Sequence, residues 1–283
     1  MQKIAIITDS CAGIPAQMAV ENGIFVLPLI IRVSGTEYRA DKDLFPSDIY
    51  EILKREIPKT SLPSADSACA LFQSLLDQGY THAIAIMLSG ALSGTANMLR
   101  VVGAQFEQLT LTVWDSLSGS IGCGISVLEA ASDIKAGKSF EEINARIPSL
   151  LKNTHVFFSV DTLEYLQKGG RIGKITAIAG TALQIKPILS FTPDGQLSNV
   201  SKVRGKKMVL PALCEHVKKY VTPGCRYNLM VADGGDPETG KLLHDQLEDM
   251  FPDHERYIYT NIDSTLSCYI GPGVLGAGIQ ILE

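Results

Sequence analysis

The sequence predicts an α/β protein of two domains: an N-terminal domain with a parallel sheet covered by helices on both faces, and a smaller C-terminal α/β domain with a mixed sheet. Apolar runs typical of buried strands alternate with helical patterns through residues 1–153. After that point, two strands flank the turn Pro193-Asp194-Gly195, which predicts an antiparallel hairpin. With 46% hydrophobic residues, the 283-residue chain has ample material for packed cores. We therefore place the domains at residues 1–153 and 154–283.

The first elements follow from local signals. Residues 3–8 form an apolar run that is expected to be a buried strand. Pro15 opens a helix, and Gly23 ends it, because proline suits the first turn of a helix and glycine its end. A single second strand is expected over residues 25–32, where Pro28 indicates an edge or a bulge.

Polar residues mark the boundaries of the next elements. Ser47 is expected to cap a helix, since its hydroxyl can accept from a free amide of the first turn. Residues 59–64 predict a polar loop. Ser139 and Glu142 have the spacing of a capping box that opens a further helix. The other elements expected in this half are helices through residue 76 and over 121–135, and strands over 83–88 and 109–114.

The strand at residues 83–88 leads into a loop rich in hydroxyls and glycines at residues 89–95, and a helical pattern follows. Ser93 or Thr95 is expected to cap that helix. Glycines let a ligand approach the backbone, and the positive end of the helix favours an anion, so the loop suits a phosphate or a carboxylate. Such loops lie at the carboxyl ends of parallel strands, where ligands bind. An ordinary strand-to-helix turn with a serine cap is the alternative.

The C-terminal half mixes a hairpin with helices. Asp161 is expected to cap a helix that reaches Gln167, and an apolar helix is expected near residues 175–183. The other predicted elements are strands over 156–160, 186–191, 197–204, 228–232, 256–261 and 277–282, and helices over 206–220 and near 237–249.

Composition excludes several classes of function. The net charge is −5, which argues against nucleic acid as the main partner. We find no signal peptide and no membrane span. Six scattered cysteines without a CxxC pair predict reduced thiols and a cytoplasmic location.

Familiar cofactor and catalytic motifs are absent or incomplete. The series Gly271-x-Gly273-x-x-Gly276 is followed by only seven residues, too few for the unit that binds a dinucleotide. A Walker-type loop at residues 170–174 would need glycine where Lys168 stands. The five histidines show no metal spacing, and no serine lies in a GxSxG elbow. The sequence therefore offers hydroxyls, amides and glycines in quantity but few catalytic bases, which suits holding an anionic head group better than catalysis.

Six motifs carry a family resemblance. They are Thr8-Asp9-Ser10, residues 59–64, Leu92-Ser93-Gly94-Thr95, residues 161–171, residues 185–188, and Ile270-Gly271-Pro272-Gly273. In this order, and over nearly the whole chain, they resemble the motif series of the DegV family. The resemblance implies two α/β domains that hold one long-chain fatty acid in a tunnel between them, without catalytic residues, cofactor or metal.

The resemblance also implies a role and partners. Proteins of this kind are the carrier component of bacterial fatty acid kinase, and a separate ATP-binding subunit phosphorylates the bound acyl carboxylate. The acyl phosphate enters phospholipid synthesis, which is compatible with transient contact at a membrane surface. By the same resemblance, Arg171 and Arg204 match basic positions near the site opening and for the kinase partner.

Particular residues are expected at the carboxylate. Thr60, Ser61 and Ser93 match the family's head-group positions, and the amides of Gly94 and Thr95 could add donors. Two departures concern this site. Tyr269 stands where members of this type commonly have a histidine, and the loop runs Ser-Gly-Ala at residues 89–91 instead of Ser-Ser-Gly. A phenol can donate a hydrogen bond but carries no positive charge near neutral pH.

The acyl chain would need an apolar tunnel. Ile175, Ile178, Leu183 and Ile188 are candidates to line it, although each suits plain core equally well. Two other functions remain open: a hydrolase or phosphotransferase that uses Asp9, Ser93 or Asp115 in the crevice, and a lipid sensor or storage protein without a kinase partner.

Overall fold

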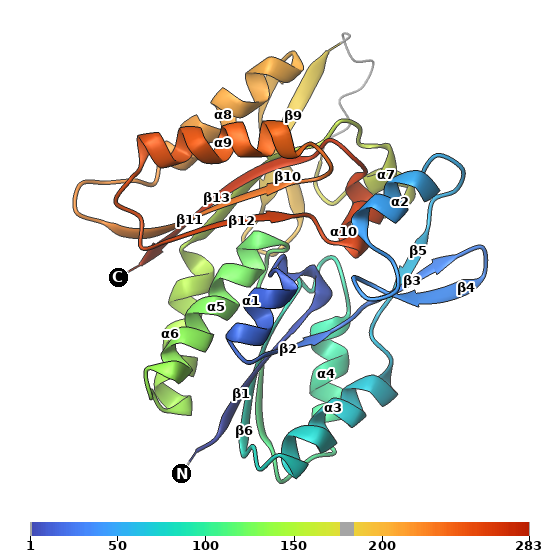
Figure 1. The fold of residues 1–283 in the computed structure, drawn as a ribbon, viewed down its shortest axis with the longest axis vertical. Coiled ribbons are helices and arrows are strands. Elements are labelled where there is room, and N and C mark those ends of the chain that lie inside the picture. Colours follow the sequence, from blue (N-terminus) through green and yellow to red (C-terminus); the bar gives the residue numbers. More distant parts are fainter. Residues whose placement is uncertain (1, 176–183, 283) are drawn as a thin grey trace.

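The computed structural model of the chain describes residues 2–175 and 184–282. The helix expected near residues 175–183, with Ile178 and Leu183, therefore lies outside the described residues for all but its first position. The molecule has a parallel sheet at the N-terminal end and a larger mixed sheet at the other, with α5 and α6 between them (Figure 1). The fold class predicted from the sequence is confirmed.

The first sheet has the strand order β2-β1-β6-β7, and all its strands are parallel. Alternate residues of β1 face opposite layers: Ile7 packs with α3 and α4, whereas Ile6 packs with α5. Its elements are β1 (Ile4–Asp9), β2 (Ile24–Leu27), β6 (His82–Met87), β7 (Thr110–Asp115), α1 (Ala16–Glu21), α3 (Ala65–Asp77), α4 (Thr95–Gly103), α5 (Ile121–Lys135) and α6 (Phe140–Lys152).

The second sheet has the order β10-β9-β8-β13-β11-β12. Only the β11–β12 pair is parallel, and its other four pairs are antiparallel. Helices α8 and α9 cover its outer face, and α5 faces the inner one (Figure 1). Its elements are β8 (Thr154–Ser159), β9 (Ile185–Phe191), β10 (Leu197–Arg204), β11 (Arg226–Asp233), β12 (Arg256–Asn261), β13 (Leu275–Leu282), α8 (Val209–Lys218) and α9 (Pro237–Met250).

Two predictions from the sequence are wrong in the region of a small antiparallel sheet. The strand predicted over residues 25–32 is two strands in different sheets, β2 and β3 (Ile30–Val33), because the chain turns at Pro28, which has no amide to donate. Residues 59–64 are not all loop. β5 (Lys59–Ser61) pairs with β3, and β4 (Thr36–Arg39) lies on the other side.

Helix starts also differ from those predicted. Helix α2 (Pro46–Ile52) begins before Ser47, and the Asp48 carboxylate accepts from the Phe45 amide at 2.8 Å. Helix α7 (Glu164–Lys168) has Thr162 rather than Asp161 bonded to its first amide. The predicted capping box of α6 is confirmed, since Ser139 Oγ and the Glu142 carboxylate each accept from the other's amide. The remaining elements of the described residues are the short helices η1 (Ser10–Ala12), η2 (Lys206–Met208) and α10 (Ser264–Ile270).

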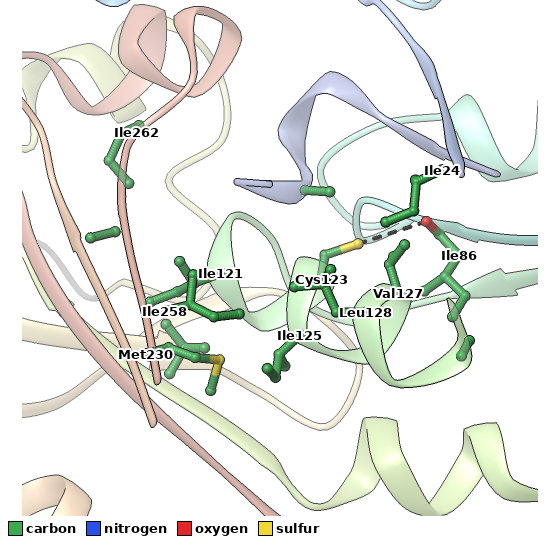
Figure 2. Packing of buried hydrophobic residues seen from close by; sticks show 14 of the residues in the cluster. Ile24, Ile86, Ile121, Cys123, Ile125, Val127, Leu128, Met230, Ile258 and Ile262 are labelled. Atoms are coloured by element: carbon green, nitrogen blue, oxygen red, sulfur yellow. Dashed lines mark hydrogen bonds between the residues drawn. The ribbon is translucent and has the colours of Figure 1, made fainter. Parts of the chain in front are cut away.

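Helix α5 joins the two sheets through one continuous core. Its residues are buried on nearly every side, and its two buried carboxylates, Glu129 and Asp133, are ion-paired with Arg146. Ile121 faces Met230 and Ile258 of the second sheet, whereas Cys123 points toward the first, where its thiol lies 3.8 Å from the Ile86 carbonyl oxygen (Figure 2). Among the described residues, no helix combines the length and the apolar character that crossing a bilayer requires.

Candidate functional site

A cavity lies where the two sheets and α10 meet. Its volume is about 280 Å³, close to the lower end of the range of about 300–1,000 Å³ for small-molecule pockets. Side chains from both predicted domains line it, and most are apolar. The apolar set is Leu29, Leu62, Leu88, Leu92, Ile121, Val156, Phe158, Leu166, Phe191, Leu197, Ala232, Ile262, Leu266, Ile270 and Val274. Such a hollow suits the hydrocarbon part of a ligand.

Polar side chains gather on one part of this wall. Thr60 Oγ1 and the Tyr269 hydroxyl lie 2.5 Å apart, although 209 residues separate them in the chain. The Arg171 guanidinium lies over the Tyr269 ring, 5.0 Å from its centroid. Ser61 and Ser93 line the same cavity. The structure therefore brings together five of the residues singled out from the sequence.

Arg171 has more N–H donors than its protein partners within the described residues use. Its Nε donates to the Leu92 carbonyl at 3.2 Å, and its Nη1 donates to the Gly169 carbonyl at 2.9 Å. A guanidinium has five N–H donors. Within the described part of the chain, these are its protein partners, and no carboxylate pairs with it. A half-buried cation without a counter-ion beside an apolar cavity favours an anionic ligand group there.

The loop before α4 differs in detail from its prediction. Ser93 Oγ bonds to Thr95 Oγ1 at 2.8 Å, and Gly94 occupies the N-cap position without a side-chain cap. The expected cap by Ser93 or Thr95 is therefore wrong, because the two hydroxyls satisfy each other. Only Ser93 of these three residues lines the cavity, while Thr95 is buried behind it.

Two aspartates hold this loop in place. The Asp9 carboxylate accepts from the amides of Cys11 and Leu88, both at 2.9 Å, and its burial raises its pKa to about 6. Asp115 Oδ2 accepts from the Gly90 amide at 3.0 Å. A β-carbon at residue 90 would lie 2.5 Å from that oxygen, so a larger residue there would have to displace the Asp115 side chain.

Comparison with known proteins decides the family. The model of a family described as uncharacterised DegV proteins matches residues 3–281. The chain belongs to the DegV family. A DegV domain-containing protein of Clostridium acetobutylicum is 36% identical over 277 residues, which is 98% of each chain.

Solved DegV structures share this fold. A DegV family protein from Thermus thermophilus, described by its fatty acid binding, superposes with a TM-score of 0.93 at 27% identity, over 99% of this chain and all of that one. DegV of Bacillus subtilis, described as a fatty acid binding protein, gives a TM-score of 0.90 at 27% identity over the whole of both chains.

The other predicted site residues of this DegV protein lie elsewhere. Ile188 is fully buried on the face of β9 that packs against α8, whereas its neighbour Leu189 belongs to the inner core. Ile175 is buried in the inner core but is not among the described residues that line the cavity. Arg204 is exposed at the end of β10. The Asp9 of the enzyme alternative lines a separate hollow with Asp41 and does not meet Ser93.

Most cavity-lining apolar residues were missed from the sequence. The clearest available signal is on α10, where Thr265, Leu266, Tyr269 and Ile270 recur at helical spacing on one face. Asp263 caps this helix by accepting from the Leu266 amide at 2.9 Å, so a cap signal was present as well. The helix has only seven residues, too few for its period to stand out.

Proposed function

We propose that this protein binds one long-chain fatty acid, with its carboxylate at the polar wall and its chain along the apolar one. The observation that carries the proposal is the continuity of a single cavity from the Thr60–Tyr269 pair and Arg171 to a set of leucine, isoleucine and phenylalanine side chains. The described fatty acid binding of the DegV proteins from Thermus thermophilus and Bacillus subtilis supports it.

The head group would be held by neutral and charged donors together. Hydroxyls of Thr60, Ser61 and Ser93 and the phenol of Tyr269 can each donate to a carboxylate oxygen. Arg171 would supply the positive charge that a tyrosine lacks, and hydrogen bonds to an ionised carboxylate are about twice as strong as neutral ones. Gly94 and Thr95 do not line the cavity, so their amides would support the loop that carries Ser93.

The acyl chain would supply most of the gross binding free energy. Each methylene moved from water to an apolar site contributes roughly 0.8 kcal/mol. The lining of the cavity provides that site, and Ile175 contributes to the core around it. No cofactor is needed for this binding.

The carrier role is the finer part of the proposal. The bound carboxylate would be presented to a separate ATP-binding kinase subunit, with exposed Arg204 as a contact for that partner. The support is the resemblance of the motif series. The same role implies a cytoplasmic protein that meets membranes transiently.

The enzyme alternative has less support. No histidine among the described residues lines the cavity, and both oxygens of the Asp9 carboxylate accept from backbone amides. General acid–base chemistry needs a titratable group within reach of the ligand. The sensor or storage alternative shares the same cavity and differs only in lacking a kinase partner.

Native mass spectrometry of freshly purified protein, followed by extraction of the ligand, tests the proposal. We expect a mass excess of one long-chain fatty acid.

Combining Thr60→Ala with Ser93→Ala should weaken its binding while the fold stays intact. A control that combines Thr110→Ala with Ser159→Ala, both outside the cavity lining, should bind normally. A protein that takes up no fatty acid would overturn the proposal, and unchanged affinity in the first double variant would remove the carboxylate site. Formation of acyl phosphate with a kinase subunit would separate a carrier from a sensor.

A further inference from the structure

Part of the cavity wall is the inner face of the second sheet, formed there by β8, β13 and β11. The register of these strands places Phe158, Gly276 and Ala232 side by side, and all three line the cavity. We call these residues the first row. Gly276 has no side chain and Ala232 has only a methyl group, so a ligand over them lies close to the backbone. Glycine in the interior of a strand often marks a close approach of this kind.

The second row of the same face, Val156, Gly278 and Met230, lies two residues further along each strand. Here the space over the glycine is filled: a β-carbon on Gly278 would lie 3.0 Å from Met230 Cε and 3.3 Å from Val156 Cγ2. Over Gly276 of the first row, the nearest atoms to such a carbon are Phe158 Cβ and two backbone carbonyl oxygens. Val156 lines the cavity that the described residues form, whereas Met230 is fully buried and lies behind that lining. The second row therefore closes the cavity.

Helix α5 meets the sheet at the second row. A β-carbon on Gly122 of this helix would lie 2.5 Å from Val156 Cγ2, so the valine fits against a position where the helix has no side chain. Met230 faces Ile121 of the same helix, and Ile121 itself lines the cavity (Figure 2). Sheet and helix are therefore packed together over the second row, where Val156 and Met230 form an end wall.

A third row, Thr154, Gln280 and Asn228, lies beyond the end wall and is polar. Gln280 Nε2 donates to Thr154 Oγ1 at 2.9 Å, and Asn228 Nδ2 donates to Gln280 Oε1 at 3.0 Å. Gln280 and Asn228 are fully buried, and none of the three lines the cavity as the described residues form it. A chain that displaced these groups would break buried hydrogen bonds, which costs free energy. On this side of the cavity, space for a longer chain can therefore come only from the end wall.

The polar wall lies at the opposite end of this face. Helix α7, which precedes Arg171, follows β8, and α10, which carries Tyr269, follows β12. Strands β8, β11 and β12 run in the same direction, so both helices lie beyond the carboxyl ends of these strands. In β8 and β11, the second row lies nearer the start of the strand than the first row does. A fatty acid with its carboxylate at the polar wall therefore points its methyl end at the end wall.

We propose that Val156 and Met230 set the length of the acyl chain, because the methyl end of the chain stops against them. Val156 is held between Gly122 and Gly278 and has a branched, stiff side chain, so its part of the end wall is fixed. Met230 fills the space over Gly278 with the end of an unbranched side chain. A methylene that the end wall excludes forgoes the favourable burial of the rest of the chain. This inference rests on the proposed function, because it concerns the length of acid that the same cavity accepts.

Competition between saturated acids of increasing length tests this inference. Native mass spectrometry would follow a series from dodecanoic to docosanoic acid. Combining Val156→Ala with Met230→Ala opens the space over Gly278, so the preferred acid should become longer. An acid that buries about two more methylenes should gain about tenfold in affinity relative to the acid that the unaltered protein prefers. Each single substitution should shift the preference in the same direction by less.

Matched variants separate length selection from loss of stability. Val127→Ala removes the same atoms from a fully buried position of α5 outside the cavity lining, so it should destabilise the fold and keep the original length preference. Gly276→Ala adds a methyl group to the first row and should favour shorter acids. An unchanged length preference in the folded variants of Val156 and Met230 overturns this inference and leaves fatty acid binding standing. A protein that binds no acid of any length overturns both.

Discussion

Helix α5 lies between the two sheets, whereas α10 lies at the cavity against α2 and α7, and the two helices are built in opposite ways. Helix α5 has 15 residues and is buried on nearly every side, with Leu128 among its fully buried side chains. Helix α10 has seven residues, and its face toward the cavity carries Thr265 and Tyr269. The carboxylates of Asp41 and Asp263 lie near the start of α10. One helix holds the two halves together, while the other carries the Tyr269 hydroxyl at the cavity, where it is bonded to Thr60. Stability and binding are therefore expected to respond to different substitutions.

The largest effect is expected from α5. Leu128→Ala leaves a cavity in the shared core and should lower the free energy of unfolding by about 2–5 kcal/mol. The folded fraction should still bind fatty acid with its ordinary affinity. Urea unfolding measures the first effect and a binding titration the second. Leu266→Ala, on the half-buried face of α10, is the matched control: a smaller loss of stability but weaker binding are expected there. The reverse pattern would contradict the division of roles.

The next effect concerns the charge at the polar wall. Arg171→Gln removes the guanidinium that has no carboxylate partner within the described residues, and it should weaken fatty acid binding by about 10–100-fold, which corresponds to about 1.5–3 kcal/mol. Stability should change little, because the side chain bonds only two carbonyls of the described chain. Lys202→Gln, on the exposed side of β10, should leave affinity unchanged. Equal affinities of the two variants would remove Arg171 from the site.

A smaller effect is expected in the dependence of stability on pH. Burial and the neighbouring Asp41 carboxylate raise the pKa of Asp263, and burial raises that of Asp9 to about 6. The folded protein therefore keeps these protons at pH values where the unfolded chain, with a carboxyl pKa near 4, has lost them. The contribution of these groups to stability thus falls as pH rises from about 4 through 6.

Asp263→Asn tests that expectation. The substitution keeps an oxygen that can accept from the Leu266 amide, and it removes the carboxyl group that ionises. The free energy of unfolding at pH 7 should rise by roughly 1 kcal/mol, and its decline between pH 4 and 7 should become shallower. Urea titrations at several pH values measure both. Asp66→Asn, on the first turn of α3 and away from this group, should leave the slope as it is. An unchanged slope for Asp263→Asn would show that its charge does not act on stability.

The smallest effect is expected at the phenol. Tyr269→Phe keeps the ring under Arg171 and removes the bond to Thr60, so affinity for the fatty acid should fall about 3–10-fold, as for the loss of one ordinary hydrogen bond. Tyr165→Phe, whose ring packs against Gly271, is the control without an effect. A loss as large as that of Arg171→Gln would mean that the phenol, rather than the guanidinium, carries head-group recognition.

The sequence predicted the layers of the fold well and the site only through a resemblance. Alternation of apolar strands and helices marks a parallel sheet, and the turn at Pro193-Asp194-Gly195 marks the hairpin of the mixed sheet. The meeting of Thr60 with Tyr269 has no local signal, because it depends on how distant elements pack. The sequence also does not show which face of a strand each of two adjacent apolar residues occupies. Ile188 and Leu189 are both apolar, yet they point into opposite layers.

The walls of the cavity come from nearly the whole length of the chain, from Leu29 to Gly276. Strand β13 lies between β8 and β11, and its Gly276 lines the cavity. The hollow therefore takes shape only when segments from both ends of this sequence have packed together. Folding of either half alone would leave the cavity without part of its wall.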